Sequence, residues 1–245
     1  MKKRMLQIAL LSSLCFCGCS EKRAVFSWET ITDVTALKSN NISVIYQYVR
    51  PEENPADVQQ ALEGYCLYYL VGESWADTDY LLEAVERGAN FQGIMLDCEP
   101  YIRDDWEEKK EEYLEQYIQQ VKLLSQEADN ELWITLPRWY DEVGLETQLE
   151  QLIASVKTGI CLLDYYQGSE AEFAALEIAL CKKYGKQIVI AYELKKADGE
   201  EIKEKNTYYH LGIQAVVENY RENFTKDVYG LAFHDYTHVQ ELTKK

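Results

Sequence analysis

Short apolar runs alternate with amphipathic segments along most of the chain, and the alternation repeats eight times. The runs have the length and apolar content of buried parallel strands, and they cover 24–28, 42–48, 66–71, 93–96, 132–136, 159–163, 187–192 and 228–234. The intervening segments have helix-like polar and apolar patterning, and they cover 30–39, 55–63, 77–88, 106–128, 145–156, 170–184 and 205–223. The tail at 239–245 has room for a short eighth helix.

Eight strand–helix units without a Pro- or Gly-rich linker predict a single (β/α)8 TIM barrel of the α/β class over residues 19–245. An open, doubly wound sheet is the competing topology, and it normally has a glycine-rich turn after its first strand. The residues at that place are Ser27, Trp28, Glu29 and Thr30, which form no such turn. The closed barrel is therefore the preferred interpretation.

The first residues of the chain predict a bacterial lipoprotein signal peptide over 1–18. A positively charged start at 2–4 precedes a short apolar run at 5–16, which is too short to span a bilayer. Gly18 then stands directly before Cys19, as in a lipobox. We expect acylation of Cys19 and anchoring to the bacterial cell membrane on its extracytoplasmic side, with plain secretion as the alternative.

Composition excludes several classes of function. The chain has 25 Lys and Arg against 42 Asp and Glu, a net charge of −17, which disfavours binding to nucleic acid. Only 3 His are present, and Cys66, Cys98, Cys161 and Cys181 lack CxxC spacing, so we expect no metal site and no cofactor. No feature of the sequence specifies an oligomeric state.

The predicted strands end in aromatic and acidic residues, and in a (β/α)8 barrel the strand ends carry the functional side chains. Aromatic rings stack on the C–H faces of sugars, and carboxylates bind hydroxyls or transfer protons. The strand ends therefore predict a carbohydrate site. The expected substrate-binding residues are Trp28, Tyr46, Trp139, Asp164, Tyr166 and His234. Rim tyrosines and tryptophans with a purely packing role are the alternative.

The fourth predicted strand carries the candidate catalytic pair. Side chains alternate along a strand, so Asp97 and Glu99 share one face while the apolar Leu96 lies on the other. The apolar face should contact the helices, which directs both carboxyls into the mouth of the barrel. Repulsion between them should raise one pKa and keep Glu99 protonated as a general acid, with Asp97 as its partner. A solvated carboxylate pair is the alternative.

The segment 91–99, FQGIMLDCE, resembles the strand-four signature F-D-G-I-D-[IL]-D-W-E of family 18 glycoside hydrolases, the chitinase-like barrels. The resemblance implies that Glu99 donates a proton to the glycosidic oxygen and that Asp97 orients a substrate acetamido group. In that family the acetamido oxygen attacks the anomeric carbon, so the enzyme supplies no nucleophile. Gln92 and Met95 stand where the family has aspartates.

Two other interpretations of the site stay open. Glu193 ends the seventh predicted strand and is a candidate second carboxylate, paired with Glu99 as nucleophile at roughly 5–5.5 Å in a retaining mechanism. Alternatively, Gln92 and Met95 indicate a barrel that binds carbohydrate without catalysis. A glycoside hydrolase acting on a β-linked or N-acetylated glycan is the leading hypothesis, and another hydrolytic or proton-transfer enzyme on this fold is less favoured.

Overall fold

The computed structural model describes residues 21–244 except 73, 201 and 225–226. The predicted signal peptide and Cys19 lie outside the described residues. Among the described residues, no helix combines the length and apolar character needed to cross a membrane.

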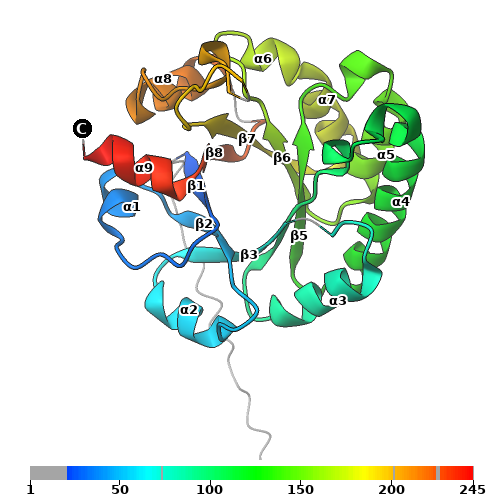
Figure 1. The fold of residues 1–245 in the computed structure, drawn as a ribbon, viewed down its shortest axis with the longest axis horizontal. Coiled ribbons are helices and arrows are strands. Elements are labelled where there is room, and N and C mark those ends of the chain that lie inside the picture. The colour runs from blue at the N-terminus through cyan, green and yellow to red at the C-terminus, as the bar shows by residue number, and fades with distance from the viewer. Residues whose placement is uncertain (1–20, 73, 201, 225–226, 245) are drawn as a thin grey trace, which may run out of the picture.

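Eight parallel strands close into one barrel, in which each strand pairs with the next and β8 pairs with β1 (Figure 1). The strands are β1 (Lys22–Ser27), β2 (Val44–Tyr48), β3 (Cys66–Gly72), β4 (Gly93–Asp97), β5 (Glu131–Pro137), β6 (Gly159–Leu163), β7 (Gln187–Glu193) and β8 (Gly230–His234). Lys22 lies opposite Gly230 in the closing pair. The structure confirms the predicted (β/α)8 TIM barrel.

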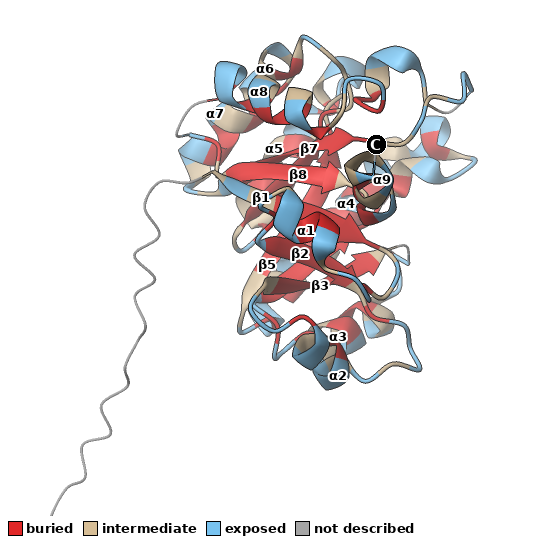
Figure 2. Ribbon diagram, turned by 90° about the vertical axis from the view of Figure 1, so that its left-hand side faces the viewer, coloured by how far each residue is buried: buried red, intermediate tan, exposed pale blue. Residues whose placement is uncertain are grey.

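Helices surround the barrel and cover the outer face of the sheet (Figures 1 and 2). The described helices are α1 (Thr35–Ser39), α2 (Pro55–Ala61), α3 (Thr78–Arg87), α4 (Trp106–Glu127), α5 (Glu146–Ser155), α6 (Glu170–Phe173), α7 (Ala175–Tyr184), α8 (Ile213–Asn223) and α9 (Tyr236–Thr243). Short 3-10 turns lie at Pro100–Ile102, Asp141–Val143 and Glu204–Asn206. Helix α1 is shorter than the predicted segment 30–39.

Local backbone chemistry explains where two of the helices begin. The predicted segment 205–223 becomes α-helical only in α8, which begins after Gly212, because Gly212 has a φ of 82° that a right-handed helix does not admit. The predicted tail helix at 239–245 begins earlier, as α9. The Asp235 carboxylate caps its first turn by accepting the backbone N–H of His238 at 3.2 Å.

Alternating side chains divide the core into two shells. One shell packs the outer face of the strands against the helices, and the other fills the inside of the barrel. Aromatic rings fill much of the inner shell. The ring of Tyr46 lies between those of Phe26 and Tyr68, with its centroid 4.8 Å from the first and 5.6 Å from the second. Gly159 leaves room for the neighbouring Trp133 ring, because a Cβ there would lie 2.8 Å from it and 2.3 Å from a backbone oxygen. The barrel is a packed core.

Candidate active site

A cleft of about 1370 Å³ opens at the carboxyl ends of β1 to β4. It runs from the mouth of the barrel outward over the segments that follow β3 and β4. Its lining residues are Trp28, Tyr48, Gly72, Ser74, Trp75, Ala76, Asp77, Thr78, Asp79, Tyr80, Asp97, Glu99, Ile102, Arg103, Tyr113 and Gln116. Three of the sequence-predicted site residues, Trp28, Asp97 and Glu99, therefore lie together in one cleft.

Asp97 is the last residue of β4 and is 9% exposed. The alternation predicted for this strand holds, since Met95 packs inside the barrel while Leu96 packs against the helices. Thr135 on β5 donates its hydroxyl to Asp97 Oδ1 at 2.7 Å. Burial raises the pKa of Asp97, against the opposing effects of the charge on His234 and of the Thr135 hydrogen bond.

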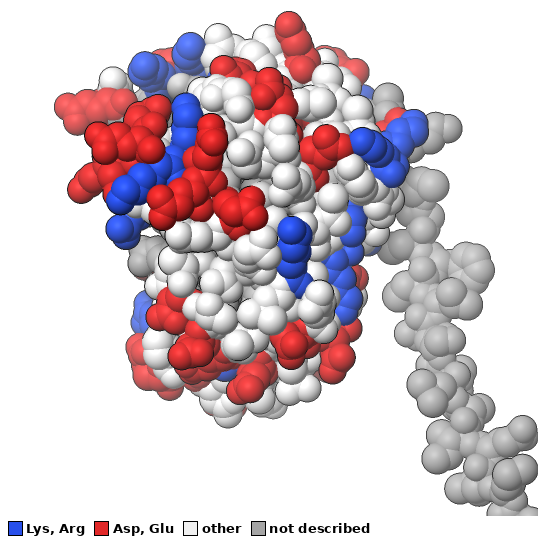
Figure 3. Space-filling view, turned by 90° about the vertical axis from the view of Figure 1, so that its right-hand side faces the viewer, with Lys and Arg blue, Asp and Glu red and all other residues white. Residues whose placement is uncertain are grey.

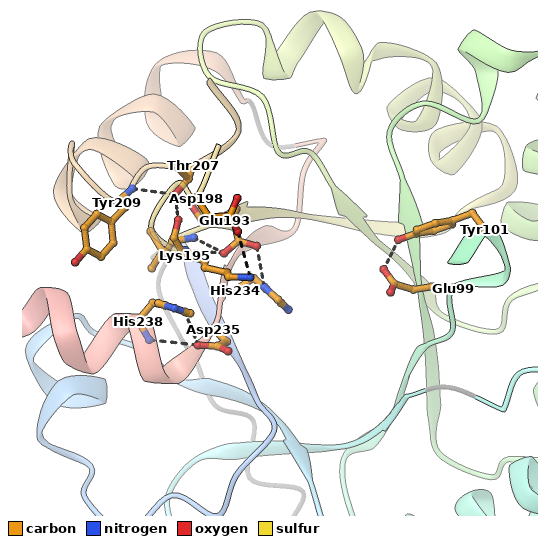
Figure 4. A network of polar contacts seen from close by, with 11 residues as sticks. Glu99, Tyr101, Glu193, Lys195, Asp198, Thr207, Tyr209, His234, Asp235 and His238 are labelled. Carbon is orange, nitrogen blue, oxygen red and sulfur yellow. Dashed lines mark hydrogen bonds and ion pairs between the residues drawn. The ribbon is translucent and has the colours of Figure 1, made fainter. Parts of the chain in front are cut away.

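Glu99 lies two residues beyond Asp97 and is partly buried. The hydroxyl of Tyr101 donates a hydrogen bond to Glu99 Oε1 (Figure 4). Burial raises the pKa of Glu99, the charge on Asp97 raises it further, and the Tyr101 hydrogen bond and the charge on His234 oppose the rise. A carboxyl with a raised pKa that borders a cleft has the property required of a general acid.

Trp139 packs against Tyr101 and does not line the cleft. Its ring packs edge-on against Tyr101 and Tyr140, with centroids 5.3 and 5.1 Å apart, and Trp106 completes the cluster. Trp139 was expected to stack on substrate, but it is part of an aromatic cluster that packs around Tyr101, the hydrogen-bond partner of Glu99.

Trp28 lies at the cleft as expected, across the end of β3. A Cβ on Gly72 would lie 2.8 Å from two carbons of the Trp28 ring, so the ring occupies this place only because residue 72 has no side chain. Tyr48 lies beside Trp28, with ring centroids 5.9 Å apart. The two rings form an aromatic wall of the cleft.

Tyr46 lies deeper in the barrel than the sequence interpretation required. It is 3% exposed, and its ring is packed between Phe26 and Tyr68 in the inner shell. The side chain of Tyr48 is on the same face of β2 as that of Tyr46, but it is two residues closer to the mouth and lines the cleft. The rim tyrosine of this strand is therefore Tyr48 rather than Tyr46.

Asp164 and Tyr166 also lie away from the cleft. Asp164 follows the inward-facing Leu163 and is 1% exposed, and neither of its carboxyl oxygens accepts a hydrogen bond from any described residue. Burial, with the charge on Glu170, raises the pKa of Asp164 to about 8. Tyr166 packs against Phe173, with ring centroids 5.1 Å apart.

Tyr165, between Asp164 and Tyr166 in the sequence, points toward the barrel axis instead. Tyr165 packs with the inner shell and contacts the ring of His234, with centroids 5.9 Å apart. Sequence reasoning assigned no role to Tyr165, Tyr101 or Thr135. For Thr135, the available signal was a hydroxyl on the inward face of an otherwise apolar strand.

His234 and Glu193 form an ion pair at the ends of β8 and β7, across the mouth from Glu99 (Figure 4). Glu193 is 3% exposed, and its Oε2 lies 3.1 Å from His234 Nδ1. Its Oε1 accepts the backbone N–H groups of Leu194 and Lys195 at 2.8 and 2.7 Å. Both oxygens of Glu193 are thus engaged within the protein, and the residue does not line the cleft.

The charge state of His234 follows from this pairing. Burial disfavours the imidazolium, but the hydrogen bond and charge of Glu193, with the charges of Asp97 and Asp235, outweigh burial and raise the pKa of His234 to about 9. His234 is therefore a cation at neutral pH and faces two carboxyls with raised pKa values. Within the described ranges, no group of three or more His, Cys, Asp or Glu residues is arranged to hold a metal ion.

The sequence matches no model of a known protein family, and no curated protein matches it. Solved structures share its fold. An endo-β-N-acetylglucosaminidase from Cordyceps militaris has a TM-score of 0.55 at 11% identity and covers 93% of this chain and 91% of its own. A chitinase from Chromobacterium violaceum has a TM-score of 0.53 at 9% identity, covering 92% and 98%. The spore cortex-lytic enzyme of Bacillus megaterium has a TM-score of 0.54 at 13% identity, covering 87% and 70%. The chain thus shares the barrel fold of these proteins.

Proposed function

We propose that the protein is a glycoside hydrolase in which Glu99 is the general acid and Asp97 is its partner. The observation that carries the proposal is the pair of carboxyls with raised pKa values at the floor of an aromatic-walled cleft. Chitinases and an endo-β-N-acetylglucosaminidase share the barrel. A glycan containing N-acetylated sugars is accordingly the proposed substrate.

In the proposed reaction, protonated Glu99 gives its proton to the glycosidic oxygen as the bond to the anomeric carbon breaks. Asp97 Oδ1 is held by Thr135, which leaves Oδ2 to accept the N–H of the substrate acetamido group. The acetamido oxygen then attacks the anomeric carbon, and water opens the resulting ring with Glu99 as the base.

The state of Glu193 favours this substrate-assisted scheme over a two-glutamate scheme. A nucleophile needs a free oxygen at the anomeric carbon, whereas Glu193 is buried and holds two backbone N–H groups and His234. In this proposal Glu193 keeps His234 charged. The His234 cation in turn stabilises the carboxylate forms of Asp97 and Glu99 as protons move between steps.

Three isosteric variants assayed on one N-acetylated oligosaccharide test the scheme. Glu99→Gln cannot deliver a proton, so turnover should fall by roughly 10²–10⁴-fold while glycan binding survives. Asp97→Asn should also reduce turnover, whereas Glu193→Gln should reduce it much less than Glu99→Gln does. Glu29→Gln, at an exposed rim position outside the cleft, is the matched control. Full activity in Glu99→Gln would remove the proposal.

A carbohydrate-binding barrel without hydrolysis is the second candidate. Met95 favours it, because it is fully buried and its thioether cannot share a proton with Asp97 as an aspartate at that position would. Binding of glycans by the wild-type protein without release of new reducing ends would favour this candidate.

The lipid anchor is a separate part of the proposal, and it is supported by the charged start, the short apolar run and the Gly18–Cys19 step. We expect Cys19→Ala to leave the chain unprocessed or to release it from the membrane, as measured by cell fractionation and intact mass. Cys17→Ala, two residues earlier, is the matched control and should fractionate as the wild type does. Unchanged fractionation and processing of Cys19→Ala would contradict acylation.

A further inference from the structure

The position where β1 begins determines which end of the barrel lies next to the proposed anchor. Glu21 precedes β1 directly, and Arg221 at the end of α8 binds its carboxylate with two hydrogen bonds of 2.7 and 3.0 Å. Arg23 binds the same carboxylate. Because β1 begins at the end of the barrel opposite the mouth, Glu21 is clamped to that opposite end.

Very little chain separates this clamp from the proposed acylation site. Only Ser20 lies between Cys19 and Glu21, and two extended residues span at most about 7 Å. The Cα atom of an acylated Cys19 therefore lies within about 7 Å of the Cα atom of the clamped Glu21, so the tether is short compared with the roughly 20 Å length of the barrel strands.

Charged side chains of both signs surround the same end of the barrel. The acidic ones include Glu21, Glu63, Asp129, Glu131 and Asp227, and the basic ones are Lys22, Lys157, Lys182, Lys183, Lys186 and Arg221. Some have carboxylate partners, such as Asp227 for Lys182 at 3.6 Å. Other basic side chains have different contacts: the ammonium of Lys22 lies over the Tyr229 ring, and Lys157 donates to backbone carbonyls.

The lining of the cleft has an excess of acidic side chains. Asp77, Asp79, Asp97 and Glu99 line the cleft with Arg103 as the cation among them. On the side of the molecule that Figure 3 presents, Lys and Arg side chains lie among acidic ones toward both edges, and acidic side chains continue along the lower part. Because charges of both signs lie at the anchored end, the orientation rests on the short tether, and the acidic cleft lining does not favour contact with anionic headgroups.

We propose that the end of the barrel opposite the mouth faces the membrane that holds the acyl chain and that the cleft opens away from it. The inference uses the proposed anchor and is independent of the proposed hydrolase. Seven-residue strands such as β7 span roughly 20 Å, which sets the scale of the gap between the headgroups and the cleft. Glycans of the surrounding extracytoplasmic layer reach such a cleft, while sugars attached to lipids of the same membrane do not.

Two cysteine variants of the full, processed chain test the orientation, each carrying the same fluorophore. Lys157→Cys labels the end near the anchor, and Lys196→Cys labels an exposed position beyond the end of β7, on the mouth side. Both are made with Cys66→Ser, because Cys66 is half-buried whereas the other three described cysteines are buried. Each protein is reconstituted into phosphatidylglycerol vesicles that contain headgroup spin-labelled lipid, a contact quencher.

We expect fluorescence to be lost at residue 157 and kept at residue 196. Equal quenching at the two positions, or the reverse order, would overturn the orientation. An intact mass that lacks acyl chains, with no retention on the vesicles, would overturn it as well and would locate the failure in the anchor. Glycan hydrolysis by the same labelled proteins in detergent is scored separately, so a missing hydrolase activity is not confused with a wrong orientation.

Discussion

The ion pair of His234 and Glu193 should make the stability of the protein depend on pH, and Glu193→Gln removes the source of this dependence. Glutamine keeps the shape of the side chain and an oxygen that can accept the N–H groups of Leu194 and Lys195. It carries no charge, so the largest contribution that favours the imidazolium is lost and the pKa of His234 should fall from about 9. The half-buried imidazole of the variant should therefore lose its proton at a lower pH than that of the wild type.

The size of the effect follows from proton linkage. Raising the pKa of His234 from 6.5 to about 9 corresponds to about 3 kcal/mol of differential stabilisation. The side chain of His234 is 26% exposed, so solvent screening reduces this to about 2–3 kcal/mol. Because the pKa is higher in the folded state, the stabilisation is complete below pH 6.5 and is lost as the pH rises through 9.

Urea unfolding of the wild type and of Glu193→Gln at intervals from pH 6 to 9.5 measures the effect. We expect the difference in their unfolding free energies to shrink by about 2–3 kcal/mol over this range. Asp164 also titrates in this range, with its pKa near 8, but it is present in both proteins and cancels in the difference. Glu204→Gln removes the partner of the exposed His210 and is the matched control. A difference that stays constant with pH would refute the charged-pair interpretation.

Two further variants probe the contacts of the cleft. Tyr101→Phe removes the hydrogen bond that lowers the pKa of Glu99, so the alkaline limb of the pH–rate profile should move to higher pH. Asp97→Asn removes a charge that raises this pKa, so the same limb should move to lower pH. Shifts in the same direction in the two variants would contradict the assignment of Glu99 as the acid. Gly72→Ala should displace the Trp28 ring and weaken glycan binding, measured by titration calorimetry, at a cost of roughly 1–3 kcal/mol in stability. Unchanged glycan affinity in Gly72→Ala would exclude a binding role for that ring.

The fold and the placement of Asp97 and Glu99 at the mouth followed from the sequence because local patterns specify them. Eight apolar runs separated by amphipathic segments leave few topologies other than a closed barrel. On β4, Leu96 between Met95 and Asp97 sets the parity of the strand, and once the parity is known both carboxyls must face the mouth.

Other residues depended on information that no local pattern contains. Tyr46 and Tyr48 have the same parity, and only the register and tilt of the closed barrel determine which of them reaches the rim. On β6 both faces are apolar, so the pattern did not indicate that Asp164 turns outward and Tyr165 inward. Tyr101 contacts Glu99 through a turn whose path depends on packing against Trp139.

The cleft draws its described lining only from the first four strands and the segments that follow them, as far as Gln116 on α4. Groups that act on the two carboxyls of the cleft come from the other half of the chain: Thr135 on β5 binds Asp97, and the charge of His234 on β8 lowers the pKa of both Asp97 and Glu99. The walls of the cleft and part of its charge environment are thus encoded in different halves of the sequence. Insertions or substitutions after β3 and β4 can reshape the walls of the cleft without touching Thr135 or His234. The arrangement gives the protein a route to admit different ligands while the charge environment of Asp97 and Glu99 is kept.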